Sequence, residues 1–182
     1  YFYEFVNCLK EKGEEYPLSH AQAKEHHQWI ADYMDKDFIS KLEQLPRTIN
    51  VTIENKSLLF IHYHIEKSKF NEHISKDPFS KIVKPSLDNL TSLFKGNKEN
   101  LICFGHHHPL HFFEGNNTIF LNPSSLGCNA KPTAPYSIVE LEKDKIIISL
   151  EEVSYDNTAF LKSYELLKVP DRDFIMKVFH GN

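Results

Sequence analysis

Two pairs of histidines are the residues of this sequence with the most evident chemistry. His62 and His64 follow one short apolar run, and His106 and His108 follow another. In an extended chain, residues i and i+2 project to the same side, so each pair can present two imidazoles to one cavity. Neutral imidazole is the commonest metal ligand in proteins. The spacing therefore predicts a metal site that draws on both pairs.

The elements that must position these histidines are two buried strands. Ser57–Ile61 and Leu101–Phe104 are short continuous apolar runs, typical of strands that are covered on both faces. Before them, residues 49–53 alternate between apolar and polar, which predicts a half-buried strand. In open α/β sheets, ligand sites form beyond the carboxyl ends of the strands. The histidines stand at that position in both cases.

The remaining pattern alternates hairpins with helices. Two hairpins are predicted, one from residues 110–113 and 118–121 and the other from residues 136–141 and 145–153. Helices are predicted over residues 1–12, 20–34 and 86–93, from residue 156 onward, and from Pro170 to about residue 179, with residues 65–80 as a surface loop. We expect an α/β (α+β) domain over residues 1–155 and a C-terminal helical extension over residues 156–182.

Composition excludes several classes of protein. The 182 residues are 41% hydrophobic and 25% charged, which is ordinary for a globular domain. No apolar stretch approaches the roughly 20 residues of a transmembrane helix, so no membrane is expected. The net charge of -4 makes a nucleic-acid-binding surface unexpected. Three widely spaced cysteines without a CxxC motif favour a reducing compartment, which predicts a cytoplasmic protein.

Three motifs resemble those of the calcineurin-like metallophosphoesterases, most closely the small bacterial members. Gly105-His106-His107-His108 resembles the family's GHTH motif, and the strand that ends in His62-Tyr63-His64 resembles its strand ending in HG or HGH. Asn122-Pro123-Ser124-Ser125 resembles the NPGS loop that follows the GHTH hairpin. The resemblance covers about residues 45–155 and agrees in order, strand context and approximate separation.

The resemblance implies a β-sandwich flanked by helices and the hydrolysis of phosphate mono- or diesters by a metal-activated hydroxide. Two divalent ions, Mn foremost or Fe, Zn or Ni, would lie about 3.5–4 Å apart. His62 and His106 would share one ion, and His108 would bind the other. His64, His107 and Tyr63 would line the mouth near the substrate, which is a small phosphate ester or a phosphoprotein.

The sequence departs from the family pattern at three motif positions. Tyr63 replaces a small glycine, His107 replaces threonine, and Ser124 replaces the glycine of NPGS, where glycine would reach a positive φ easily. The family's earlier D-x-H, GD and GN motifs, which supply the bridging aspartate and the general acid, have no counterpart here.

Tyr1 resembles the region just after the GN motif. We therefore expect two further βα units upstream, on the order of 60 residues, with the general acid among them. The 182-residue chain would hold about three metal ligands and only part of a dinuclear site. Little or no phosphoesterase activity is expected of it alone. Robust metal-dependent turnover of an aryl phosphodiester by a sample of 21.3 kDa would show this expectation to be wrong.

Two alternatives stay open at the level of sequence. His106, His108 and Glu114 loosely mimic the HxH…E arrangement of cupin-type oxygenases and isomerases. The altered GHHH and NPSS motifs also fit a phosphoesterase fold that has lost catalysis and binds a partner. The C-terminal stretch from Phe160 to Phe179 is amphipathic, which favours packing on its own domain or, alternatively, a homo-oligomer formed through these helices.

Overall fold

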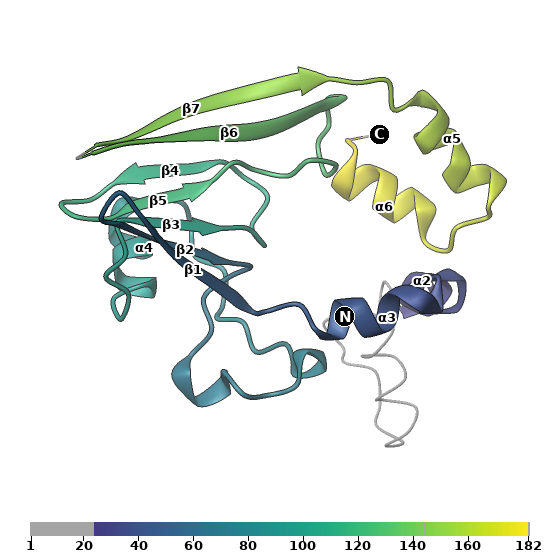
Figure 1. The fold of residues 1–182 in the computed structure, drawn as a ribbon. Coiled ribbons are helices and arrows are strands. Elements are labelled where there is room, and N and C mark those ends of the chain that lie inside the picture. The colour runs from purple at the N-terminus through teal and green to yellow at the C-terminus, as the bar shows by residue number, and fades with distance from the viewer. Residues whose placement is uncertain (1–23, 144, 182) are drawn as a thin grey trace. The chain divides into compact units, whose positions relative to one another are not determined.

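A mixed five-stranded sheet forms the centre of one of two compact units (Figure 1). The computed structural model describes residues 24–143 and 145–181. The strand order is β1-β2-β3-β5-β4, and a separate two-stranded sheet pairs β6 with β7. The strands are β1 (Thr48–Ile53), β2 (Lys56–Ile61), β3 (Leu101–Phe104), β4 (His111–Glu114), β5 (Ile119–Asn122), β6 (Thr133–Glu142) and β7 (Lys145–Ser154).

The three central strands run parallel, and both edge strands are antiparallel to their neighbours. β2 pairs with β3 and β3 with β5 in parallel, so their carboxyl ends share one edge of the sheet. β1 and β4 pair with β2 and β5 as antiparallel hairpins. The predicted strands and the hairpin across residues 110–121 are thereby confirmed, but β1 is not half-buried: its apolar residues Ile49, Val51 and Ile53 are exposed. In the turn between β1 and β2, Glu54 and Asn55 have positive φ angles of 49° and 61°, as short hairpin turns require.

The central strands are buried on both faces, as their continuous apolar sequences predict. On one face, α4 (Leu87–Leu93) packs against Leu59, Ile102 and Phe120 through Leu90 and the adjoining Phe94. The opposite face is covered by the β6–β7 hairpin, through a cluster of Leu58, Leu101, Leu121, Val139, Leu141, Ile146 and Ile148. Figure 1 shows α4 and the hairpin on opposite sides of the sheet. The expected α/β architecture, a sheet layer flanked by a second sheet and by helix, is confirmed.

A serine that caps its first turn explains where α4 begins. The Ser86 hydroxyl accepts a hydrogen bond from the amide of Asn89 at 3.2 Å and so caps the start of α4.

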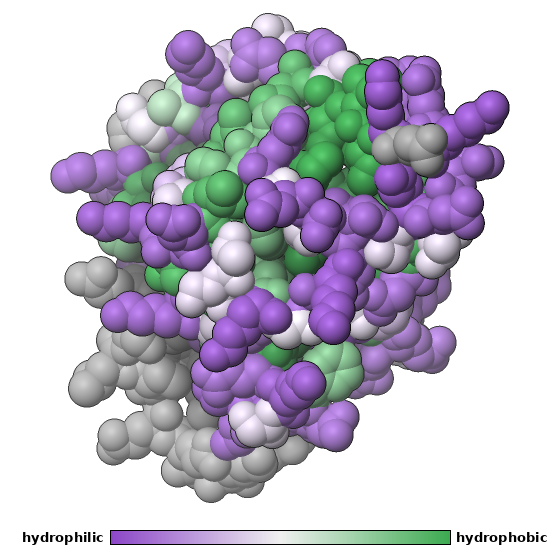
Figure 2. Space-filling model, turned by 90° about the vertical axis from the view of Figure 1, so that its left-hand side faces the viewer, coloured by the Kyte–Doolittle hydropathy of each residue, from purple (hydrophilic) through white to green (hydrophobic). Residues whose placement is uncertain are grey.

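The β6–β7 hairpin also carries exposed apolar side chains, among them Tyr136, Ile138, Ile147 and Val153. Figure 2 shows hydrophobic side chains gathered on the upper part of one face of the molecule. The hairpin is therefore apolar on both of its faces.

The second unit is helical. It contains α2 (Lys24–Tyr33), α3 (Ile39–Glu43), α5 (Thr158–Leu166), α6 (Arg172–Phe179) and the short 3₁₀ turns Lys36–Phe38, Lys67–Lys69 and Ile74–Lys76. The predicted helix over residues 1–12 lies outside the described residues. On α2, His27 is buried with 7% of its surface exposed, as is Ala31 one turn further along. Within the described residues, no helix is long and apolar enough to cross a membrane.

Candidate metal centre

Two neighbouring parallel strands deliver His62 and His106 to the same edge of the sheet. Ile61 at the end of β2 is in register with Phe104 at the end of β3, so the residues that follow begin side by side. The amide of Gly105 donates a hydrogen bond to the carbonyl of His62 at 2.9 Å and ties the two chain segments together beyond the last ladder pair. The parallel pairing of β2 with β3 therefore places the two histidines side by side.

The rings of His62 and His106 face each other. His62 Nε2 and His106 Nδ1 lie 3.1 Å apart, and the ring centroids are 5.1 Å apart. Both rings also lie against Phe79, at centroid distances of 5.0 Å and 5.2 Å. The pair of nitrogens thus lies beside an aromatic side chain.

The backbone of His106 adopts a conformation that is rare for a residue with a side chain. Its φ angle is 67°, in the left-handed region. Such a conformation costs a non-glycine residue on the order of 1–3 kcal/mol and persists only where the surroundings hold it. The left-handed turn thus stands at the residue whose ring meets that of His62.

The two nitrogens lie within hydrogen-bond distance of each other, and the same separation also suits one metal ion bound between them. Two nitrogens at about 2.0–2.1 Å from one ion lie about 3.0 Å apart at a right angle and about 3.4 Å apart at a tetrahedral angle. The observed 3.1 Å falls inside that range. Within residues 24–143 and 145–181, no group of three histidine, cysteine, aspartate or glutamate side chains is placed to hold a metal. The described residues therefore provide a two-nitrogen half-site.

The two histidines of each HxH pair were predicted to project to the same side of an extended chain, and this prediction is wrong. β2 ends at Ile61 and β3 ends at Phe104, so the histidines follow the strands instead of lying in them. The chain bends at residues 62–63 and again at 106–107. Alternation along an extended chain consequently does not apply, and the two members of each pair have different surroundings.

His64 and Tyr63, predicted to lie near a substrate, make contacts with the interior. His64 Nδ1 is 2.8 Å from the Ser80 hydroxyl, and its ring meets Phe94 edge-on at 5.5 Å. Tyr63 is buried with 1% of its surface exposed, and its hydroxyl accepts a hydrogen bond from the amide of Val83 at 3.1 Å. In this structure the glycine-to-tyrosine departure adds a buried ring to the core beneath the site.

His107, the third residue predicted near the substrate, turns onto His111. Its Nδ1 lies 3.2 Å from His111 Nε2, and His111 Nδ1 lies 2.7 Å from the carbonyl oxygen of Pro109. Because a carbonyl oxygen only accepts, His111 must carry its proton on Nδ1 and donate it to Pro109. His111 Nε2 then accepts a hydrogen bond, and His107 Nδ1 is the donor. Burial lowers the pKa of His111 and favours this neutral form, against the opposing effect of the Pro109 carbonyl. In a neutral His107 ring the other nitrogen, Nε2, then carries no proton and can accept a hydrogen bond.

His108 is exposed, and its backbone is held by the loop that follows β5. The Ser124 hydroxyl donates to the carbonyl of His108 at 2.6 Å, and the Asn122 amide group donates to the carbonyl of His107 at 2.5 Å. Asn122 is completely buried, and its side-chain oxygen accepts from the amide of Ser124 at 3.0 Å. Ser124 has a φ of 80°, so the serine adopts the left-handed conformation that the glycine of the NPGS pattern would reach easily.

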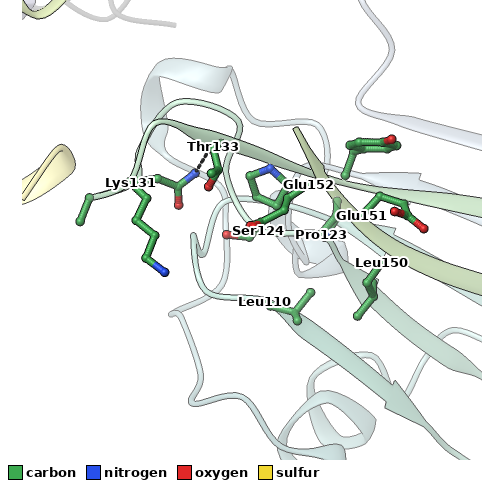
Figure 3. Close-up of a pocket in the computed structure, with 12 residues that line it drawn as sticks. Leu110, Pro123, Ser124, Lys131, Thr133, Leu150, Glu151 and Glu152 are labelled. Atoms are coloured by element: carbon green, nitrogen blue, oxygen red, sulfur yellow. Dashed lines mark hydrogen bonds between the residues drawn. The ribbon is translucent and has the colours of Figure 1, made fainter. Parts of the chain in front are cut away.

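A pocket of about 460 Å³ opens beside this loop (Figure 3). Ser124 and Pro123 form one wall, Leu110 comes from just before β4, and Leu150, Glu151 and Glu152 come from β7. Lys131 and Thr133 stand where the chain enters β6, and the Asn129 side chain donates to the Thr133 carbonyl at 3.1 Å. The pocket shares Ser124 with the network that holds His108. Sequence reasoning did not predict it, because its lining comes from four separate segments.

The comparisons with known proteins agree with this fold. The family profile described as the calcineurin-like phosphoesterase superfamily domain matches residues 20–144. A hypothetical protein from Pyrococcus horikoshii OT3 has a similar structure, with a TM-score of 0.72 at 14% identity, over 100% of this chain and 71% of that one. A metallophosphoesterase from Sphaerobacter thermophilus gives 0.63 at 17% identity, over 92% of this chain and 72% of that one.

Identities this low establish a likeness of fold, and none of the curated proteins matches the chain. The profile match is the stronger statement, because it spans more than half of the 182 residues and includes both histidine motifs and the loop that begins at Asn122. The chain belongs to the calcineurin-like phosphoesterase superfamily.

Proposed function

We propose that this chain carries part of the active site of a metal-dependent phosphoesterase, with His62 and His106 as ligands of one divalent ion. The observation that carries the proposal is the 3.1 Å separation of His62 Nε2 and His106 Nδ1, a distance suited to two ligands of one ion. Membership of the superfamily supports the reaction class, which is hydrolysis of a phosphate mono- or diester. His108 is proposed as a ligand of a second ion.

The bound metal would polarise a phosphate oxygen and lower the pKa of an attacking water. The contribution of the chain is to hold two neutral nitrogens in place without cancelling the charge of the cation. His106 is directed to His62 by its left-handed backbone, and His62 is fixed to the same edge by the hydrogen bond from Gly105. Manganese is the ion we favour, with iron, zinc and nickel as alternatives.

The pocket beside Ser124 provides room for the organic part of an ester. Its volume of about 460 Å³ lies within the range of small-molecule sites, about 300–1,000 Å³. Apolar side chains such as Leu110 and Leu150 line it together with one cation, Lys131, and two carboxylates. We propose that a small phosphate ester binds with its phosphate toward the histidines and its organic group in this pocket.

A hydrolysis assay with aryl phosphate mono- and diesters tests the proposal. Because the described residues supply a half-site, we expect slow turnover that requires added Mn²⁺ and is lost in His106→Ala. His73→Ala is the matched control, since His73 is an exposed histidine outside this site. Equal hydrolysis with and without metal would contradict the proposal, as would turnover that His106→Ala leaves unchanged.

The cupin-type alternative finds no support in the position of Glu114. Glu114 is the last residue of β4 and is paired with Ile119, whereas His106 and His108 precede the first residue of that strand. The carboxylate therefore belongs to the opposite end of β4 from the histidines, and a three-ligand set of His106, His108 and Glu114 is not proposed.

A further inference from the structure

Two loops meet at the carboxyl edge of the sheet and are joined through backbone carbonyls. The histidine loop is residues 105–109, and the NPSS loop is residues 122–125. Asn122 donates to the carbonyl of His107, and Ser124 donates to the carbonyl of His108. The two carbonyls that follow His106 in the chain are thus both held by side chains of the NPSS loop.

Asn122 can hold the histidine loop rigidly because it is itself fixed. It is the last residue of β5, none of its surface is exposed, and its side-chain oxygen accepts from the amide of Ser124 at 3.0 Å. The same amide group therefore connects the end of a core strand, the NPSS loop and the histidine loop. A buried amide with both of its ends bonded specifies one arrangement of the groups around it.

The conformation of His106 requires such support. Its φ of 67° is unfavourable for a residue with a Cβ, so without restraint the loop would relax and turn the ring away from His62. The restraints act on the peptide groups that follow His106, at His107 and His108. They reach the ring of His106 only through the backbone, which makes them positioning contacts and not contacts with substrate or metal.

We propose that Asn122 and Ser124 are positioning residues for the metal centre. By holding the carbonyls of His107 and His108, they keep His106 Nδ1 facing His62 Nε2 at a distance that suits one ion. The proposal rests on the proposed function where it concerns metal. The hydrogen bonds from Asn122 and Ser124 to the histidine loop do not require a metal. The positioning role and the binding of metal can therefore be tested separately.

The loop offers a matched pair of serines for the experiment. Ser124→Ala removes the bond that the Ser124 hydroxyl donates to the carbonyl of His108. Ser125→Ala also removes one bond to the backbone, which the Ser125 hydroxyl accepts from the amide of Cys128 at 3.0 Å. The change of residue type is the same and the positions are adjacent, but only Ser124 touches the histidine loop. Asn122→Asp is the third variant, since a carboxylate keeps the acceptor for Ser124 but cannot donate to His107.

The first readout is the affinity for Mn²⁺ by titration calorimetry on the whole chain. Loss of a group that orients a ligand weakens metal binding about 10- to 100-fold. We expect Ser124→Ala and Asn122→Asp to show a loss of that size and Ser125→Ala to stay within about twofold of the native chain. Equal affinities in Ser124→Ala and Ser125→Ala would overturn the proposal.

The second readout is the nitrogen chemical shifts of the histidine rings, measured by NMR without metal. We expect the His106 ring signals to move in Ser124→Ala and to stay unchanged in Ser125→Ala. If His106 is unaffected in Ser124→Ala, the positioning role is refuted even where metal affinity falls. If the native chain binds no Mn²⁺ and the His106 signals still move, the proposed function fails and the positioning role stands.

Discussion

Replacing Tyr63 with phenylalanine separates a role in the core from a role at the substrate. Tyr63 stands between His62 and His64 in the sequence, and its position there suggests contact with a substrate. In the structure its ring is 1% exposed and its hydroxyl accepts from the Val83 amide at 3.1 Å. Tyr63→Phe keeps the ring in place and removes that acceptor alone, so the change tests the hydrogen bond with little change in packing.

The magnitude follows from the group that loses its partner. The Val83 amide would be left without its acceptor in a part-buried setting, which costs about 1–3 kcal/mol of folding free energy. Because every 1.4 kcal/mol is a factor of ten, the unfolded population should rise by about 5- to 150-fold. Tyr155→Phe is the matched control: Tyr155 belongs to the same unit and is 38% exposed, so its change should stay within about 0.5 kcal/mol.

The assay is urea denaturation followed by circular dichroism, together with amide hydrogen exchange at Val83. We expect Tyr63→Phe to lower the free energy of unfolding and to speed exchange at Val83, while Tyr155→Phe does neither. Affinity for Mn²⁺ should not change in either variant. Native stability in Tyr63→Phe combined with a raised KM for an aryl phosphate would refute this reasoning and place the hydroxyl at the substrate.

Three further predictions concern the core, a thiol and pH. Leu90→Ala should cost about 2–5 kcal/mol in urea denaturation, because Leu90 has no exposed surface where α4 meets the sheet, and a cost below about 1 kcal/mol would contradict that packing. Burial raises the pKa of the Cys103 thiol to about 11, so at pH 8 iodoacetamide should label Cys103 far more slowly than Cys128, and equal rates by mass spectrometry would speak against this. Burial lowers the pKa of His26 and of His180 below the ordinary value of 6.5. The unfolded chain therefore binds more protons than the folded one below that pH, so the free energy of unfolding should fall as the pH drops from about 6.5. Urea denaturation at pH 7.5 and at pH 5.5 tests this, and equal stability at the two values would contradict it.

The sheet could be predicted from sequence because its strands carry unambiguous local patterns. Continuous apolar runs over residues 57–61 and 101–104 predict strands buried on both faces, and the clusters around Leu59 and Leu58 confirm this for β2. The paired runs that became β4 and β5 lie on either side of a turn rich in glycine and asparagine, which predicts their antiparallel pairing. Strand period, burial and turn chemistry agree there, so the fold could be predicted.

The site could be predicted only in part, because its geometry depends on conformations that no period describes. The meeting of His62 and His106 follows from the parallel, in-register pairing of β2 with β3; the sequence predicts the two strands and the histidines that follow them, but not this pairing. The left-handed backbone of His106 and the bond from Asn122 to the His107 carbonyl have no local signature. The one available signal was an asparagine at the end of an apolar strand, where a buried amide must find partners. The roles of His64 and His107 likewise depend on their contacts with Ser80 and His111.

The most direct test of the central claim is the amount of Mn²⁺ bound per chain, measured by elemental analysis on protein whose intact mass is 21.3 kDa. Native protein, His62→Ala, His106→Ala and His73→Ala would be loaded and desalted side by side. The half-site formed by His62 and His106 predicts about one ion per native chain, its loss in His62→Ala and in His106→Ala, and its retention in His73→Ala. Retention of the ion in His62→Ala, or its absence from the native chain, would contradict the account.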